Sequence, residues 1–227
     1  IGYGAFYYAS GLTSVTFEAG SQLTSIGSDA FFKASNLTSI TIPAGVTSIG
    51  DYAFRDASSL TSIIIPASLT SIGDYAFYYA SSLTSVTFEA GSQLTSIGNY
   101  AFDGASSLTS INIPATVVSI GSGAFGSSGL TSVTFEAGSQ LTSIGPGAFS
   151  GASSLTSINI PSSVTSIEGY VFNRASSLTS VTFEAGSQLV SIGSNAFYLA
   201  SSLTSIIIPS GVTSIGESVF EASGLTE

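Results

Sequence analysis

Apolar residues recur along the chain in a short fixed pattern, separated by serine and threonine. In one unit Leu37, Ile40 and Ile42 come first, and Val46 and Ile49 follow. The alternation around Ile40 and Ile42 has a period of two, which predicts a strand with one buried and one exposed face. The later VTSI group predicts a shorter strand on the way back, and the YAF segment after it predicts a turn that carries phenylalanine into a core.

This pattern returns every 22 to 25 residues, each time from a leucine. Long units read LTSVTFEAGSQLTSIG and short units read, for example, LTSITIPAGVTSIG. Long units begin at Leu12, Leu83, Leu130 and Leu178, and short units at Leu37, Leu60, Leu108, Leu155 and Leu203. A fixed period of this length indicates a solenoid, because one unit cannot bury its own apolar face and stacked units can.

The predicted fold is therefore a repeat solenoid, β-rich α/β. We expect a right-handed leucine-rich-repeat coil with a parallel sheet on one face and short turns or single-turn helices on the other. Residues 1–227 form a single solenoid, with a partial repeat at 1–11, nine full repeats at 12–224 and a stub at 225–227. Both ends fall inside a repeat and there is no initiator methionine, so we expect a piece of a longer chain.

The turns carry their own signals. Prolines are expected to end the strands of the short units, because they lack the N–H that a ladder needs. A glycine column is expected to bend the coil through positive φ; it consists of Gly27, Gly50, Gly73, Gly98, Gly121, Gly145, Gly193 and Gly216 and is interrupted at Glu168. The next position offers helix N-caps such as Asp51, Asp74 and Asn99.

Both the strand motif and the SIGxxAF motif resemble the BspA-like leucine-rich repeats, whose unit reads approximately LTSITIPxSVTSIGxYAFxxCxS. The resemblance covers essentially the whole chain. It implies a secreted or surface-displayed protein associated with adhesion, so the expected location is extracellular or at the cell surface. The family's frequent cysteine is alanine here, for example at Ala34, Ala57 and Ala80.

The composition of the chain argues against two classes of function, nucleic-acid binding and membrane insertion. The chain has 13 acidic and 3 basic residues, a net charge of -10, and no cysteine or histidine. Nucleic-acid binding rests on clustered Lys and Arg, so no nucleic-acid partner is expected. No apolar run approaches the roughly 20 residues that span a bilayer, so no membrane insertion is expected in this segment.

Candidate chemistry is sparse. A catalytic site needs several different side chains close together, and a near-perfect repeat places the same side chain at each position of every coil. We therefore expect no enzyme, no catalytic residues, no cofactor and no metal. Glu18, Glu89, Glu136 and Glu184 share a column but lie at least two coils apart, and they are interpreted as solvated link residues. Asn36 opens a glycosylation sequon, a near-chance match in a chain this rich in Ser and Thr.

The open face of the main sheet is the most regular polar feature and the first candidate binding face. Its residues are Ser14, Thr16, Ser39, Thr41, Ser62, Ser85, Thr87, Ser110, Asn112, Ser132, Thr134, Ser157, Asn159, Ser180, Thr182 and Ser205. Such ladders resemble surfaces that order water on ice, although a curved sheet would match a flat lattice poorly. The favoured interpretation is that these are soluble strand formers whose hydroxyls satisfy one another along the stack.

A second candidate surface is an aromatic patch near the convex side. It consists of Tyr7, Tyr8, Phe32, Tyr78, Tyr79 and Tyr198. These are either interface anchors or edge packing over the gaps between coils, and packing is favoured.

Three functions remain open. The leading hypothesis is a non-enzymatic module for protein or glycan interaction and adhesion, with the ligand unknown. The alternatives are a structural array that assembles end to end into a filament or sheath, and an ice- or crystal-surface binder that uses the Ser/Thr ladders.

Overall fold

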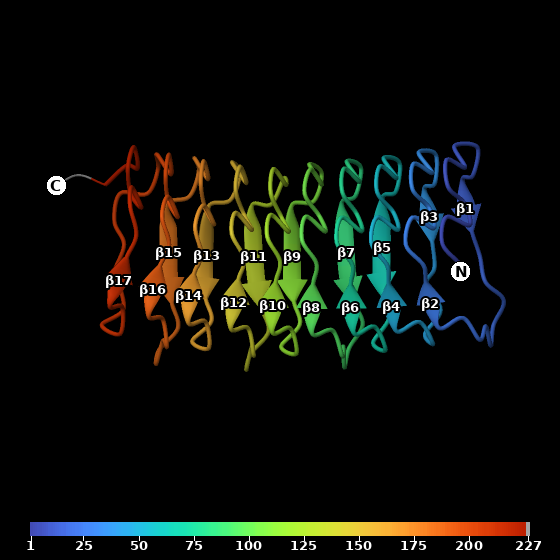
Figure 1. Cartoon of the computed structure of the whole chain (residues 1–227), viewed down its shortest axis with the longest axis horizontal. Helices are drawn as coiled ribbons and strands as arrows, with labels where there is room; N and C mark the ends of the chain where they lie inside the picture. Colours follow the sequence, from blue (N-terminus) through green and yellow to red (C-terminus); the bar gives the residue numbers. More distant parts are fainter. Residues whose placement is uncertain (226–227) are drawn as a thin grey trace.

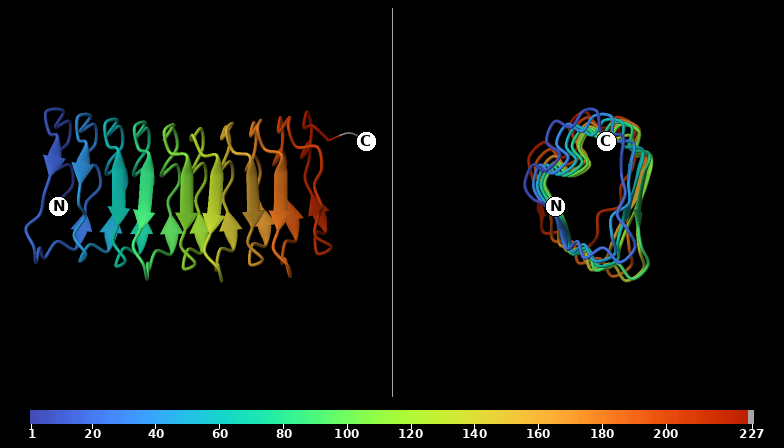
Figure 2. Two further views of the ribbon diagram at one scale, coloured as in Figure 1. Left: turned by 180° about the vertical axis from the view of Figure 1, so that it is seen from behind. Right: turned by 90° about the vertical axis from the view of Figure 1, so that its right-hand side faces the viewer.

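The computed structural model describes residues 1–225 as a rod of stacked coils (Figure 1). Each coil runs out along one sheet and back along another, so that strands of successive coils lie side by side in parallel. Figure 2 shows that the coils overlap when viewed down the rod, with the coils of both ends displaced to the same side of the middle coils, so the stack is gently bowed. The curvature expected from the sequence is therefore present and small. Residues 226 and 227 of the predicted stub lie outside the described residues.

The strands of the SxTx segments form what we call the wide sheet. They are β1 (Ser14–Val15), β3 (Ser39–Ile40), β5 (Ser62–Ile65), β7 (Ser85–Phe88), β9 (Ser110–Ile113), β11 (Ser132–Phe135), β13 (Ser157–Ile160) and β15 (Ser180–Phe183). β5, β9 and β13 each end directly before a proline, as predicted. The last short coil, from Leu203, forms no strand at Ser205, so the predicted face ends one coil early.

The VTSI segments form the return sheet, in which every strand has two residues. They are β2 (Ser25–Ile26), β4 (Ser48–Ile49), β6 (Ser71–Ile72), β8 (Ser96–Ile97), β10 (Ser119–Ile120), β12 (Ser143–Ile144), β14 (Ser166–Ile167), β16 (Ser191–Ile192) and β17 (Ser214–Ile215). These nine strands make one continuous parallel sheet. The short second strand predicted from the sequence is confirmed.

Of the short turns or single-turn helices expected from the sequence, residues 1–225 contain the turns and no helices. Two residues in each turn have left-handed φ, for example Tyr52 at 59° and Asp56 at 57°, and this interrupts a right-handed helix. Alternate N–H groups of the turns bond to the next coil, as Phe31 N does to the Ala53 carbonyl at 2.7 Å, and those between them bond within the turn, as Phe32 N does to the Asp29 carbonyl at 3.0 Å. Hydrogen bonds between coils therefore replace half of those that a helix would make within itself.

The predicted helix caps instead cap the neighbouring coil. Asp51 Oδ1 accepts a hydrogen bond from Asp74 N at 2.8 Å, and Asp74 Oδ1 accepts one from Asn99 N at 2.6 Å. Asn99 Oδ1 then accepts from Ser122 N at 2.8 Å. A ladder of side-chain acceptors thus runs along the rod, satisfying N–H groups that the turns leave free.

The glycine column was predicted for the wrong reason. None of its glycines has positive φ. A Cβ added at Gly98 would instead lie 2.5 Å from the carbonyl carbon of Gly73, so glycine is required because adjacent coils approach closely here. Glu168 interrupts the column, and the phenylalanine step across that junction, 5.6 Å between the rings of Phe149 and Phe172, is the widest of the core.

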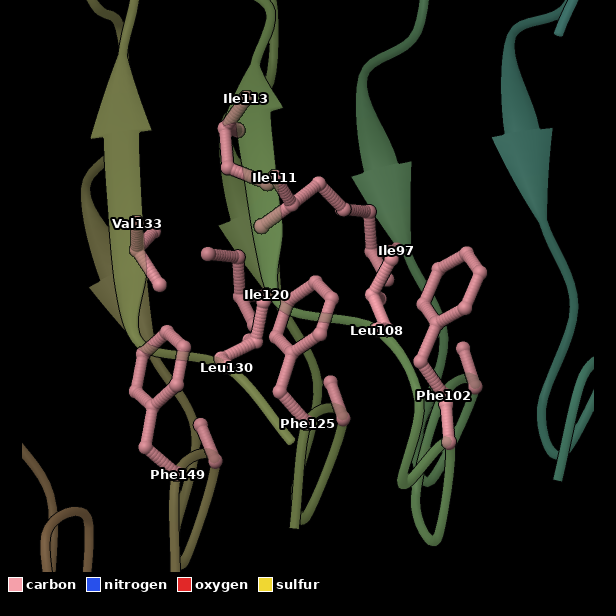
Figure 3. Packing of buried hydrophobic residues seen from close by; sticks show 14 of the residues in the cluster. Ile97, Phe102, Leu108, Ile111, Ile113, Ile120, Phe125, Leu130, Val133 and Phe149 are labelled. Atoms are coloured by element: carbon pink, nitrogen blue, oxygen red, sulfur yellow. The ribbon is translucent and has the colours of Figure 1, made fainter. Parts of the chain in front are cut away.

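The core between the sheets is made of repeated columns of leucine, isoleucine or valine, alanine and phenylalanine. Figure 3 shows Phe102, Phe125 and Phe149 lying parallel at the turn end, with Leu108 and Ile111 filling the space between the sheets. Ten phenylalanines stack from Phe6 to Phe220 with centroid spacings of 4.9 to 5.6 Å. The alanine that replaces the family's cysteine is buried within this core, as at Ala57.

Candidate interaction surfaces

The predicted polar face is present on the outer side of the wide sheet. Its serines align in register, as Ser110, Ser132, Ser157 and Ser180 do across four strands. Most of its residues are exposed, and some pair side chain to side chain. Thr134 Oγ1 donates to Asn112 Oδ1 and Thr182 Oγ1 donates to Asn159 Oδ1, both at 2.9 Å.

A threonine column beside this face uses its hydroxyls internally. Thr38 Oγ1 donates to the Thr13 carbonyl at 3.0 Å, and Thr84 Oγ1 donates to the Thr61 carbonyl at 2.9 Å. The hydroxyls therefore satisfy backbone carbonyls of the preceding coil, not one another as the sequence suggested. These donors are not free to order a water lattice.

The wide sheet is not continuous. Its strands pair as β1–β3, β5–β7 and β9–β11–β13–β15, and the number of paired residues depends on which kind of unit comes second. Where a long unit follows a short one, as in β5–β7, β9–β11 and β13–β15, four residues pair. Where the second unit is short, two residues pair at most, and β5 and β9 do not pair with the strands before them.

The link of each long unit explains this asymmetry. Glu136 N donates to the Ile113 carbonyl at 3.0 Å, and Glu136 Oε2 accepts from Ala115 N at 3.1 Å. Equivalent bonds join Glu89 to Ile65 and Ala67, and Glu184 to Ile160 and Ser162. A short unit has proline at this position, as at Pro114, and proline has no N–H to donate to the preceding coil. Three of the four glutamates interpreted as solvated link residues, Glu89, Glu136 and Glu184, are therefore backbone caps, whereas the Glu18 side chain makes no such bond among the described residues.

Crevices open where long units precede short ones. One has a volume of about 550 Å³ and lies between Phe183 and Glu184 of one coil and Ile206, Ile207 and Pro209 of the next. Two smaller crevices, of about 270 and 290 Å³, lie at the Leu12–Leu37 and Leu83–Leu108 junctions. The candidate face is thus divided into blocks, a division that the sequence analysis did not predict.

The aromatic patch forms mainly over the N-terminal half of the turn side. Tyr7 and Phe32 stack at 4.9 Å, and the Arg55 guanidinium lies 5.5 Å from the Phe32 ring and 5.0 Å from the Tyr78 ring. Arg55 therefore joins the two halves of the patch through cation–π contacts. Tyr78 packs edge-on against Tyr79 at 4.4 Å.

Two predictions about this patch need correction. Tyr198 makes no aromatic contact among the described residues, so it lies apart. A stack of Tyr52, Tyr75 and Tyr100, spaced 5.0 and 4.9 Å, was missed and adjoins Tyr78 through Tyr75. The sequence contained a signal for this stack, because each of these tyrosines follows a glycine of the column by two residues.

The titration of the turn side reflects burial. Desolvation is the largest cause that raises the pKa values of Tyr7, Tyr75 and Tyr78, and neighbouring tyrosines add to it. The carboxyl group of Asp103, which is half-buried, has its pKa raised to about 6 by desolvation. No group of three or more metal-binding side chains lies together within residues 1–225.

Comparison with known proteins identifies the repeat. The profile described as BspA type leucine rich repeat region, six copies, matches residues 1–131 and 118–227. The chain belongs to the BspA-type leucine-rich repeat family. The resemblance seen in the unit sequence is thereby confirmed. No curated protein matched the chain.

Two solved structures share the fold of this chain. The leucine-rich repeat protein TpLRR of T. pallidum is 24% identical, with a TM-score of 0.56, over 79% of this chain and 71% of that one. The pneumococcal vaccine antigen PcpA is 23% identical, with a TM-score of 0.51, over 91% of this chain and 71% of that one. Within the described part of the chain, no helix has the length and apolar character needed to cross a membrane.

Proposed function

We propose that this chain is a non-enzymatic interaction module, extracellular or displayed at a cell surface, that binds a protein or glycan ligand through the outer face of the wide sheet. The observation that carries the proposal is the exposed polar face itself, whose serines lie in register across β9, β11, β13 and β15. Solenoids characteristically bind through extended surfaces of this kind.

The crevices add concave sites to this otherwise even face. Each is rimmed by Ser, Thr or Asn and floored by half-buried apolar side chains such as Phe183 and Ile206. Concave sites that combine apolar lining with a few polar groups are typical of ligand binding. The proposed location rests on the family resemblance and on the pneumococcal protein of similar fold, which is named a vaccine antigen.

The test is a binding screen of the chain against arrays of extracellular matrix proteins and of glycans. We expect saturable binding to at least one ligand, and the double variant Thr87→Lys, Thr134→Lys should weaken it at least tenfold. The matched control is Thr70→Lys, Thr142→Lys on the return sheet, where the threonines are equally exposed. Absence of any saturable ligand, or equal losses in both double variants, would count against the proposal.

A further inference from the structure

A cavity of about 350 Å³ lies on the turn side, away from the wide sheet on which the proposed function rests. Tyr100 and Tyr170 stand at its two ends, and Gly123 and Gly147 occupy the coils between them. Asp103 also lines it. We call this cavity the tyrosine notch.

The notch is a gap in a column of tyrosines. Tyr52, Tyr75 and Tyr100 stack at 5.0 and 4.9 Å, the next two coils carry Gly123 and Gly147, and Tyr170 resumes the column. Tyrosine adopts left-handed φ throughout this column, from 54° to 63°, so the backbone does not require glycine at the two vacant positions. What the glycines provide is space. Three coil steps of about 4.8 Å separate Tyr100 from Tyr170, a span of about 14 Å.

The two glycine positions differ in which atoms surround the place that a side chain would occupy. A Cβ added at Gly123 would lie 2.4 Å from the Tyr100 ring, so this ring already covers Gly123. A Cβ added at Gly147 would meet only the Ser150 Cβ, at 3.6 Å. The vacant place is therefore above Gly147, beside the exposed end of the tyrosine stack.

One carboxylate faces this space. Asp103 is half-buried, and desolvation raises its pKa to about 6. A Cβ at Gly126 would lie 3.1 Å from Asp103 Oδ1, so a further glycine leaves room for the carboxyl group. No side chain within residues 1–225 makes a hydrogen bond to the Asp103 carboxylate, which leaves its oxygens free to accept from a ligand.

We propose that the tyrosine notch binds one sugar ring of a neutral glycan, with the apolar face of the ring stacked on a tyrosine and two adjacent hydroxyls donated to Asp103. An aromatic wall supplies contact area and a flat stacking surface, and hydroxyl donors to a carboxylate form charge-assisted bonds. Small-ligand sites usually combine apolar walls with a few polar groups in a cavity of this size.

Two other ligand classes fit less well. A cation held by aromatic rings needs them within about 6 Å, and the tyrosines at the two ends are too far apart to enclose one. Acidic glycans would meet Asp103 in a chain whose net charge is -10. A neutral ring that extends the tyrosine stack avoids both difficulties.

The experiment fills the notch with the side chain that the column already uses. Gly147→Tyr places tyrosine where the backbone conformation and the free space both allow it, and Asn195→Tyr, in the same column at φ 59°, is the matched control outside the notch. The probe is an array of neutral oligosaccharides of glucose, galactose, mannose and N-acetylglucosamine, followed by titration of any oligosaccharide that is bound.

We expect the wild type and Asn195→Tyr to bind within twofold of each other, Gly147→Tyr to lose binding and Asp103→Asn to bind at least tenfold more weakly. Asp103→Asn and Tyr170→Ala test the site independently if Gly147→Tyr does not fold. Failure of the array to retain the wild type, or glycan binding that survives both Gly147→Tyr and Asp103→Asn, would overturn the proposal. Because Thr87→Lys, Thr134→Lys lies on the wide sheet and not on the turn side, it should leave notch binding intact, which separates this site from the wide-sheet function.

Discussion

The wide sheet and the return sheet are built by the same repeat, but they respond differently to the alternation of long and short units. The return sheet runs unbroken through nine two-residue strands, whereas the wide sheet has longer strands and is divided into three groups. On the return side every unit has the same SI strand, followed by glycine in all units but the one at Glu168. On the wide side the residue after the strand is either glutamate, which has an N–H, or proline, which has none.

This difference teaches that strand length does not determine continuity in this solenoid. Continuity follows from whether every coil offers the same backbone donors and permits the same close approach. The wide sheet gains crevices from its irregular junctions, and these distinguish one part of the face from another. The regular return sheet holds the coils in register.

The largest loss of stability is expected from a substitution in the glycine column next to the return sheet, where the backbones of adjacent coils approach closely. Gly98→Val places a Cβ within 2.5 Å of the Gly73 backbone, and we expect it to destabilise the fold by about 3 kcal/mol. Gly91→Asn, in the link of the same coil, is the matched control, because nothing lies within 4 Å of that position and asparagine tolerates its φ of 77°. Thermal melting of both variants makes the comparison; equal losses would mean that the close approach does not hold the coils together.

A smaller effect is expected on the wide side. Glu136→Ala removes the acceptor of the Ala115 N–H, and we expect a loss of about 1 kcal/mol together with faster hydrogen exchange at Ala115. Glu18→Ala is the control, since the Glu18 carboxylate makes no hydrogen bond among the described residues. Denaturant titration and amide exchange measure the two variants. An unchanged exchange rate at Ala115 would show that the hydrogen bond from Ala115 N–H to Glu136 does not stabilise the preceding coil.

The smallest effect concerns the Asp103 carboxyl group on the turn side. Its pKa is raised to about 6 in the folded chain, so the folded state holds more protons than the unfolded state between about pH 4 and pH 6. Stability attributable to this group is present below that window and is lost as the pH rises through it. Asp103→Asn cannot ionise, so we expect it to match the wild type at pH 4 and to exceed it by about 0.5 kcal/mol at pH 7.5, a value reduced for solvent screening.

Melting temperatures at the two pH values test this expectation. Gln93→Glu provides a control for general charge effects, since Gln93 is exposed and lies in the link between β7 and β8, not on the turn side. A variant that gained as much stability at pH 4 as at pH 7.5 would show that ionisation of Asp103 is not the cause.

Much of the fold could be predicted because the repeat leaves few alternatives. Ile40 and Ile42 alternate with hydroxyl residues, and Phe54 recurs as Phe77 one coil later, so strands, stacking direction and core columns follow from the period. The predicted sheet-face residues are mostly exposed for the same reason. The aromatic patch was only partly predicted, because Arg55 joins Phe32 to Tyr78 across coils and no spacing within one unit reveals that contact.

The sequence by itself determined the coil, its period and which side chains point inward, since these depend on periodicity and on burial of apolar surface. Only the tertiary structure decided the contacts between coils. It assigned the glycines to close packing and not to positive φ, placed Asp51 and Asp74 as caps on the next coil, and left the tyrosine column empty at Gly147. These features depend on which atoms of the neighbouring coil lie close to each position. That distance in space cannot be read from the spacing of residues along the chain.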